Sequence, residues 1–249
     1  MNLGGVAGIC LSENMHEVGH ALKIKVLGAV AENAKALNIK DKKLFSPKKN
    51  LSSKIPLIVF SGTCMDVGKT SVASEIISHA SRIGLKIFAA KLAGVACLKD
   101  IEKMKDYGAK KAVSIIDAGL TSTVEQNGKS VEVAKGAIDY LSEDKPDYIV
   151  IEFGDGLFGE YGVMDILKDL EIQKNIKAHI GCAHDPLGAM KLFEVCKQIN
   201  APLDIISGPV TDNSVGKDFI LKNIGIPAFN ALYYNKDFFN YLLQTCLKK

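Results

Sequence analysis

From residue 55 onward, short runs of β-branched and aliphatic residues alternate with segments whose apolar residues follow the helical period. Runs such as "YIVIE" at 148–152 are apolar on both faces, which is typical of parallel strands covered by helices. We expect strands at 55–60, 86–91, 112–117, 148–152, 178–182, 203–207 and 227–231, and helices at 69–82, 99–107, 131–142, 161–170, 187–199, 214–223 and 237–247. This alternation predicts an α/β fold with a doubly wound, mostly parallel sheet of about seven strands, which binds ligands at the carboxyl ends of its strands.

Residues 1–54 do not follow this alternation. The apolar segment 6–11 is typical of a strand, segment 21–31 alternates between apolar and polar residues like a strand, and residues 35–54 are rich in lysine and end in "SPKKNLSSK". We therefore predict a small β-rich appendage with a Lys-rich linker over 1–54, followed by the α/β domain over 55–249.

Composition excludes several classes of partner. The net charge is only +3, and Arg82 is the sole arginine, so bidentate recognition of phosphate or guanine by arginine is nearly unavailable. No apolar run reaches the roughly 18 residues that a membrane span needs. The six cysteines form no C-x-x-C pair, which is typical of reduced thiols. We expect a cytoplasmic protein with neither a nucleic-acid nor a membrane partner.

His16, Glu17 and His20 form the pattern H-E-x-x-H, which on a helix presents two zinc ligands and a general base. Two features oppose that interpretation. Gly19 weakens a helix here, and the residues that follow His20 alternate with the period of a strand. A zinc metallopeptidase therefore remains only an alternative hypothesis.

A second pattern, "SGTCMDVGKTS" at 61–71, lies between a predicted strand and a predicted helix, which is the context of a phosphate-binding loop. Backbone N–H groups between Gly62 and Gly68 can surround an anion at the positive end of the helix. Lys69 would bridge the β- and γ-phosphates, and the Thr70 hydroxyl would coordinate Mg²⁺. The nucleotide-binding residues predicted from the loop are Gly62, Thr63, Cys64, Met65, Asp66, Val67, Gly68, Lys69, Thr70 and Ser71.

The loop resembles that of dethiobiotin synthetase and its ATP-dependent relatives, G-T-D-T-[DE]-V-G-K-T, because five residues separate Gly62 from Gly68. The similarity covers about residues 55–235. Cys64 and Met65 depart from the family pattern, as does "EFGDG" at 152–156, where the family has E-G-A-G-G.

This resemblance implies further site residues. Lys91, at the end of the second strand, would contact the substrate, and Asp100 and Glu152 would bind Mg²⁺ together with Thr70. ATP and Mg²⁺ are the implied cofactors, and Lys69 and Lys91 are the implied catalytic residues. The implied reaction is a synthetase- or ligase-like phosphoryl transfer to a carboxylate or carbamate of a small anionic molecule, by a homodimer.

The loop is also similar to that of the accessory P-loop proteins of molybdopterin dinucleotide synthesis, which suggests a nucleotide-binding accessory or switch NTPase as an alternative. The sequence contains no N-K-x-D guanine motif. The stretch "SGPVTDNS" at 207–214 follows the sixth predicted strand, where Thr211 and Asn213 are expected to hydrogen-bond a purine, with adenine favoured.

Overall fold

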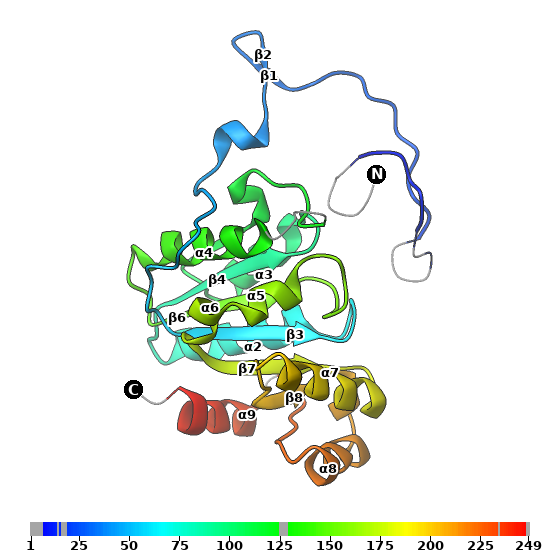
Figure 1. Ribbon diagram of the computed structural model, residues 1–249, viewed down its shortest axis with the longest axis vertical. Coiled ribbons are helices and arrows are strands. Elements are labelled where there is room, and N and C mark those ends of the chain that lie inside the picture. The colour runs from blue at the N-terminus through cyan, green and yellow to red at the C-terminus, as the bar shows by residue number, and fades with distance from the viewer. Residues whose placement is uncertain (1–6, 14, 16–18, 125–128, 234, 248–249) are drawn as a thin grey trace.

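The computed structural model describes residues 7–13, 15, 19–124, 129–233 and 235–247. The chain begins with an extended arm and continues into an α/β body (Figure 1). In chain order the elements are β1 (Ala31–Glu32), β2 (Lys35–Ala36), the 3₁₀ helix η1 (Ile39–Lys42), β3 (Leu57–Gly62), α2 (Lys69–Arg82), β4 (Ile87–Ala93), α3 (Leu98–Asp106), β5 (Lys111–Ser114), the 3₁₀ helix η2 (Ile115–Ala118), α4 (Lys129–Ser142), β6 (Tyr148–Phe153), α5 (Val163–Lys168), α6 (Leu170–Gln173), β7 (Ile176–Cys182), α7 (Pro186–Gln198), β8 (Ile205–Ser207), the 3₁₀ helix η3 (Pro209–Thr211), α8 (Ser214–Asn223), α9 (Lys236–Tyr241) and the π-helix η4 (Leu242–Cys246).

The body contains one parallel sheet with the strand order β5-β4-β6-β3-β7-β8, which confirms the predicted doubly wound α/β fold. The sheet has six strands in the described part of the chain rather than about seven. The run predicted at 227–231 makes a single bridge, between Ile206 and Ala228. Pro227 has no N–H to donate to a ladder, which limits pairing at this edge.

Both faces of the sheet are buried, because successive side chains of each strand point in opposite directions. On β3, Leu57 and Val59 pack with residues of α4, α5, α6, α7 and α8. Ile58 and Phe60 pack with residues of α2, α3 and α9 on the other face. The helices therefore cover the two faces of the sheet and leave the carboxyl ends of its strands uncovered.

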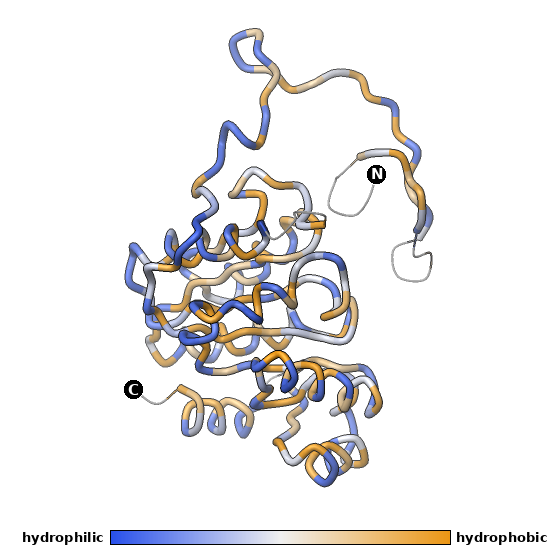
Figure 2. The backbone as a smooth tube through the Cα atoms, viewed as in Figure 1, coloured by the Kyte–Doolittle hydropathy of each residue, from blue (hydrophilic) through white to orange (hydrophobic). Residues whose placement is uncertain are grey.

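The arm contains a small antiparallel sheet, formed by β1 and β2, as expected for the β-rich appendage. The positions of its strands differ from those predicted. The described residues of the predicted strands, 7–11 and 21–30, form no strand, and large apolar side chains such as Leu22, Ile24 and Val26 are exposed. In Figure 2 hydrophobic and hydrophilic stretches alternate along the arm. Alternation alone does not make a strand, because a strand also needs a partner with which to form a ladder.

Residues 44–55, here called the strap, dock on α4 rather than forming a loose linker. Backbone bonds join Leu44 N to Asp117 O at 2.7 Å and Lys48 N to Glu132 O at 2.8 Å. The buried carboxylate of Asp139 accepts hydrogen bonds from Ser52 N at 3.0 Å, from Ser53 N at 2.8 Å and from Lys48 Nζ at 2.9 Å. The strap is therefore tied to the body by a charged acceptor.

None of the helices in the described residues is long and apolar enough to cross a membrane. All six cysteines are unpaired, as expected for reduced thiols. The cytoplasmic location itself stays a prediction.

His179 on β7 is buried against the strand that leads into the predicted phosphate-binding loop. Its Nδ1 lies 3.0 Å from the Ala201 carbonyl, so Nδ1 carries the proton, and Nε2 accepts from Ser61 Oγ at 2.8 Å. Burial lowers the pKa of His179 to about 4.

The strap generates the first prediction. Replacing Asp139 by Ala leaves the N–H groups of Ser52 and Ser53 without their acceptor, so we expect the free energy of unfolding to fall by about 3 kcal/mol. Urea unfolding of the full chain measures the change. Glu143→Ala, at an exposed acidic residue beyond the end of the same helix, should cost less than about 0.5 kcal/mol. Equal losses in the two variants would contradict this account of the strap.

The second prediction concerns pH. Because His179 is neutral in the folded protein down to about pH 4, only the unfolded chain takes up its proton below about pH 6.5. Protonation of His179 in the unfolded chain should therefore lower the free energy of unfolding by about 3 kcal/mol as the pH falls from about 6.5 to about 4. Urea unfolding at several pH values should show this loss in the wild type and not in His179→Gln. Parallel pH profiles for the two proteins would rule out the assignment.

Candidate phosphate-binding site

The loop after β3 is fixed by backbone contacts to its two neighbouring strands. Thr63 N donates to Cys182 O at 3.0 Å, at the end of β7. Gly62 O accepts from Leu157 N at 2.9 Å, in the segment that follows β6. The parallel sheet thus sets the position at which the loop leaves it.

The loop turns sharply before α2. Asp66 and Gly68 have φ values of 56° and 85°, in the left-handed region, and α2 begins at Lys69. A Cβ at Gly62 would lie 2.7 Å from Val67 Cγ2 and 3.1 Å from Lys69 Cδ. Only glycine leaves room at Gly62 for the loop to close in this way.

Lys69 lies inside this loop and is only 5% exposed. Its Nζ donates to Cys64 O at 2.7 Å, so the ammonium group spans the loop from the helix side. Burial lowers the pKa of Lys69, although the negative charge of Glu152 acts in the opposite direction. The loop thus places a cation where the sequence predicts a phosphate.

Thr70 and Glu152 meet beside the loop. The Thr70 hydroxyl donates to Glu152 Oε1 at 2.7 Å, and Glu152 is only 2% exposed. The second carboxylate oxygen, Oε2, is buried and has no hydrogen-bond partner among the described residues. Burial raises the pKa of Glu152, while Lys91, the Thr70 hydroxyl and Lys69 act to lower it. A buried oxygen without a hydrogen-bond partner suits a cation ligand, and hydroxyl and carboxylate oxygens are the ligands that Mg²⁺ prefers.

Lys91 on β4 lies in register with Glu152 on β6 and forms an ion pair with Asp100 of α3. Burial alone would lower the pKa of Lys91, but the carboxylates of Glu152 and Asp100 outweigh it and raise the pKa. The structure therefore brings together Lys69, Thr70, Lys91, Asp100 and Glu152, the five residues predicted to bind phosphate, metal and substrate.

The remaining loop residues have varied surroundings. Met65 and Asp66 are exposed, Cys64 is half-buried, and Val67 is fully buried. Ser71 Oγ accepts a hydrogen bond from Lys103 Nζ of α3 at 3.2 Å.

The two residues expected to contact a purine have other partners. Thr211 is fully buried and its hydroxyl donates to Gly208 O at 2.7 Å. Asn213 caps α8, where its Oδ1 accepts from Gly216 N at 2.9 Å. Contact of either residue with a base stays a prediction, and these two hydroxyl and amide groups give no reason to prefer adenine.

Two residues of the site lack a local sequence pattern. Leu232 lies against the start of α2, because a Cβ at Gly68 would be 2.1 Å from Leu232 Cδ2. Lys103 of α3 contacts Ser71 in the first turn of α2. Both come from distant segments, so sequence spacing could not have identified them. Gly156 belongs to the stretch "EFGDG" compared above with E-G-A-G-G, and the structure places it against the first half of the loop, since its Cβ would be 2.3 Å from Thr63 O.

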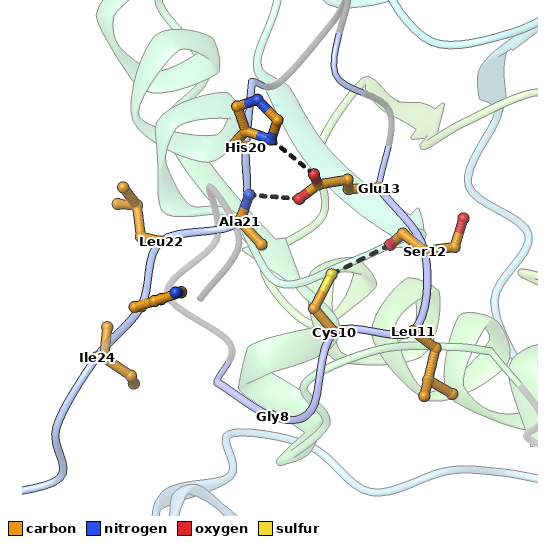
Figure 3. Close-up of a pocket in the computed structure, with 10 residues that line it drawn as sticks. Gly8, Cys10, Leu11, Ser12, Glu13, His20, Ala21, Leu22 and Ile24 are labelled. Carbon is orange, nitrogen blue, oxygen red and sulfur yellow. Dashed lines mark hydrogen bonds and ion pairs between the residues drawn. The ribbon is translucent and has the colours of Figure 1, made fainter.

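The zinc alternative rests on a part of the arm that is only partly described. His16 and Glu17 lie outside the described residues. The His20 side chain is 74% exposed, and its Nδ1 lies 2.8 Å from Glu13 Oε1 in an open hollow of the arm (Figure 3). Within the described residues, no group of three or more His, Cys, Asp or Glu side chains is placed to hold a metal ion.

Comparisons with known proteins identify a fold rather than a family. No family model matches the chain, and no curated protein matches it in sequence. The fold is similar to chloroplast FtsY from Physcomitrella patens, with a TM-score of 0.50 and 12% identity over 79% of this chain and 65% of that chain. For the signal recognition particle receptor FtsY from Elizabethkingia anophelis, the TM-score is 0.50 with 15% identity over 78% of this chain and 67% of that chain.

A third structure, FtsY from Mycoplasma mycoides, matches with a TM-score of 0.50 and 13% identity over 85% of this chain and 74% of that chain. At such low identities these likenesses show the fold alone. They do not support the narrower resemblance to dethiobiotin synthetase, which stays a prediction.

The close approach at Gly156 generates the third prediction. In Gly156→Ala the new Cβ would lie 2.3 Å from a backbone oxygen, so the two loops must separate, and we expect a loss of about 2 kcal/mol in the free energy of unfolding. Gly28→Ala is the matched control, because nothing lies within 4 Å of its Cβ. Urea unfolding compares the two, and equal stability would contradict the packing of the loops.

Proposed function

We propose that the protein is a Mg²⁺-dependent P-loop NTPase that binds a nucleoside triphosphate at the loop between β3 and α2. One observation supports this most strongly: the loop, Lys69 and Thr70 lie around Glu152, whose Oε2 has no hydrogen-bond partner among the residues that the structure describes. A buried carboxylate beside a helix N-terminus and a buried lysine suits a site that receives both a polyphosphate and a cation.

Different groups of the chain would bind the phosphates and the metal. Backbone N–H groups of the loop and of the first turn of α2 would donate to the phosphates. Lys69 would leave Cys64 O and donate to phosphate oxygens instead, and it would stabilise the charge that develops during transfer. Thr70, Asp100 and Glu152 would hold Mg²⁺, which neutralises phosphate charge when bound.

The finer proposal concerns the phosphoryl acceptor. Phosphoryl transfer to a carboxylate or carbamate would use Lys91 to hold the anionic group of a small molecule, as the resemblance to dethiobiotin synthetase implies. ATP as the nucleotide and a homodimer as the assembly also come from that resemblance.

The alternative is a nucleotide-dependent switch that hydrolyses its nucleotide slowly and acts on a partner. It is favoured by the fold neighbours, which are named as FtsY and, in one case, as a signal recognition particle receptor. Steady-state turnover separates the two hypotheses, because a synthetase is stimulated by its carboxylate substrate and a switch protein is not.

The fourth prediction tests nucleotide binding itself. Lys69→Ala removes a charge-assisted donor from the loop, so we expect the affinity for Mg²⁺·ATP or Mg²⁺·GTP to fall about a hundredfold. Calorimetric titration of the full chain with each nucleotide, with and without Mg²⁺, measures the change and also shows which base is preferred. Lys99→Ala, at an exposed lysine, should bind as the wild type does. Unchanged binding by Lys69→Ala would disprove the proposed function.

A further inference from the structure

Lys91 lies between two carboxylates that the proposed function assigns to Mg²⁺. It pairs directly with Asp100, and Glu152 lies opposite it in the register of β4 and β6. The side chains of Lys91 and Asp100 are only 15% and 17% exposed, so the pair is largely withdrawn from solvent. Lys91 therefore contacts one of these carboxylates and lies opposite the other across two paired strands.

The space for this lysine depends on glycine. A Cβ at Gly154, after β6, would lie 3.1 Å from Lys91 Cε, and one at Gly94, after β4, would lie 3.8 Å from it. Gly154 N also donates to Ala93 O at 3.0 Å, which holds the two loops together around the lysine side chain. The position of the ammonium group is therefore fixed by backbone as well as by charge.

We propose that the Lys91 ammonium is an internal counter-ion, which takes the place of Mg²⁺ in the nucleotide-free protein and leaves Asp100 when Mg²⁺ arrives with the nucleotide. The proposal rests on the proposed function, because it requires Mg²⁺ to bind beside Thr70 and Glu152. It adds that the metal and the Lys91–Asp100 ion pair exclude each other.

The physical reason is the balance of charge and ligands. Mg²⁺ loses its water reluctantly and needs six oxygens, whereas the protein offers a hydroxyl and two carboxylates that a tethered ammonium already neutralises. Without nucleotide, the ion pair between Lys91 and Asp100 is therefore more stable than a bound Mg²⁺. Phosphate oxygens add both ligands and negative charge, and a divalent ion then repels the lysine from Asp100.

The exchange also sets an order of binding. While Lys91 is paired with Asp100, its ammonium is engaged by a carboxylate of the chain itself. Once released, it can receive the anionic group of an acceptor. Mg²⁺·nucleotide would therefore bind first and the acceptor second, and α3, which contains Asp100 and also contacts Ser71 through Lys103, would respond to the exchange.

The fifth prediction tests the proposal with Mn²⁺ as the probe, because Mn²⁺ replaces Mg²⁺ at oxygen sites and is detected by electron paramagnetic resonance. In nucleotide-free full-length protein, Lys91→Met should bind one Mn²⁺ at least about tenfold more tightly than the wild type, because two carboxylates lose their counter-ion. Lys99→Met is the matched control, since it removes the same charge from the residue beside Asp100 without touching the pair. It should bind Mn²⁺ as the wild type does.

The outcomes separate the two proposals. If Lys91→Met binds Mn²⁺ no more tightly than Lys99→Met while the wild type still binds Mg²⁺·nucleotide, the counter-ion role is overturned and the proposed function stands. If the wild type binds no nucleotide in calorimetry, the proposed function fails. Lys91→Gln, a polar replacement, must give the same result as Lys91→Met and replaces it if Lys91→Met does not unfold cooperatively. Lys91→Arg, which keeps the charge, should bind Mn²⁺ in the nucleotide-free protein as weakly as the wild type does.

Discussion

A carboxylate buried at the carboxyl end of the central sheet is the constraint on which the site depends. Glu152 is 2% exposed, and a charge withdrawn from water in this way is costly unless donors or cations compensate it. Thr70 supplies one hydrogen bond, and Lys69 and Lys91 supply positive charge from two sides. The loop between β3 and α2, the end of β4 and the start of α3 therefore all lie around this one carboxylate.

The register of the parallel strands makes this gathering possible. Glu152 pairs with Phe60 of β3 on one side and with Lys91 of β4 on the other, so the segments that follow all three strands begin at the same edge. Gly62 and Gly156 then let the segments approach to distances at which a Cβ would collide with its neighbours. These two glycines therefore set how closely the loop after β3 and the segment after β6 approach each other.

The N-terminal region shows the opposite situation. The strap is held by the buried Asp139 and packs on α4, but the arm that precedes it exposes apolar residues, and its regular structure is the short hairpin of β1 and β2 and the 3₁₀ helix η1. Its alternating sequence resembles a strand, yet no strand of the described chain forms a ladder with residues 21–30. The alternation of apolar and polar residues therefore predicts a strand only where a neighbouring strand is available to pair with it.

The sequence by itself determined most of the local structures of the body and the position of the loop between β3 and α2. α2 and α8 have the predicted bounds, and Lys69 and Thr70 follow the loop as expected, because period, glycine placement and helix start are properties of neighbouring residues. Only the tertiary structure decided the strand order, the docking of the strap, the approach of Leu232 and Gly156 to the loop, and the pairing of Lys91 with Asp100. These depend on which distant segments share a sheet edge and on which charges must be compensated when one carboxylate is buried, and neither is recorded in the spacing of residues along the chain.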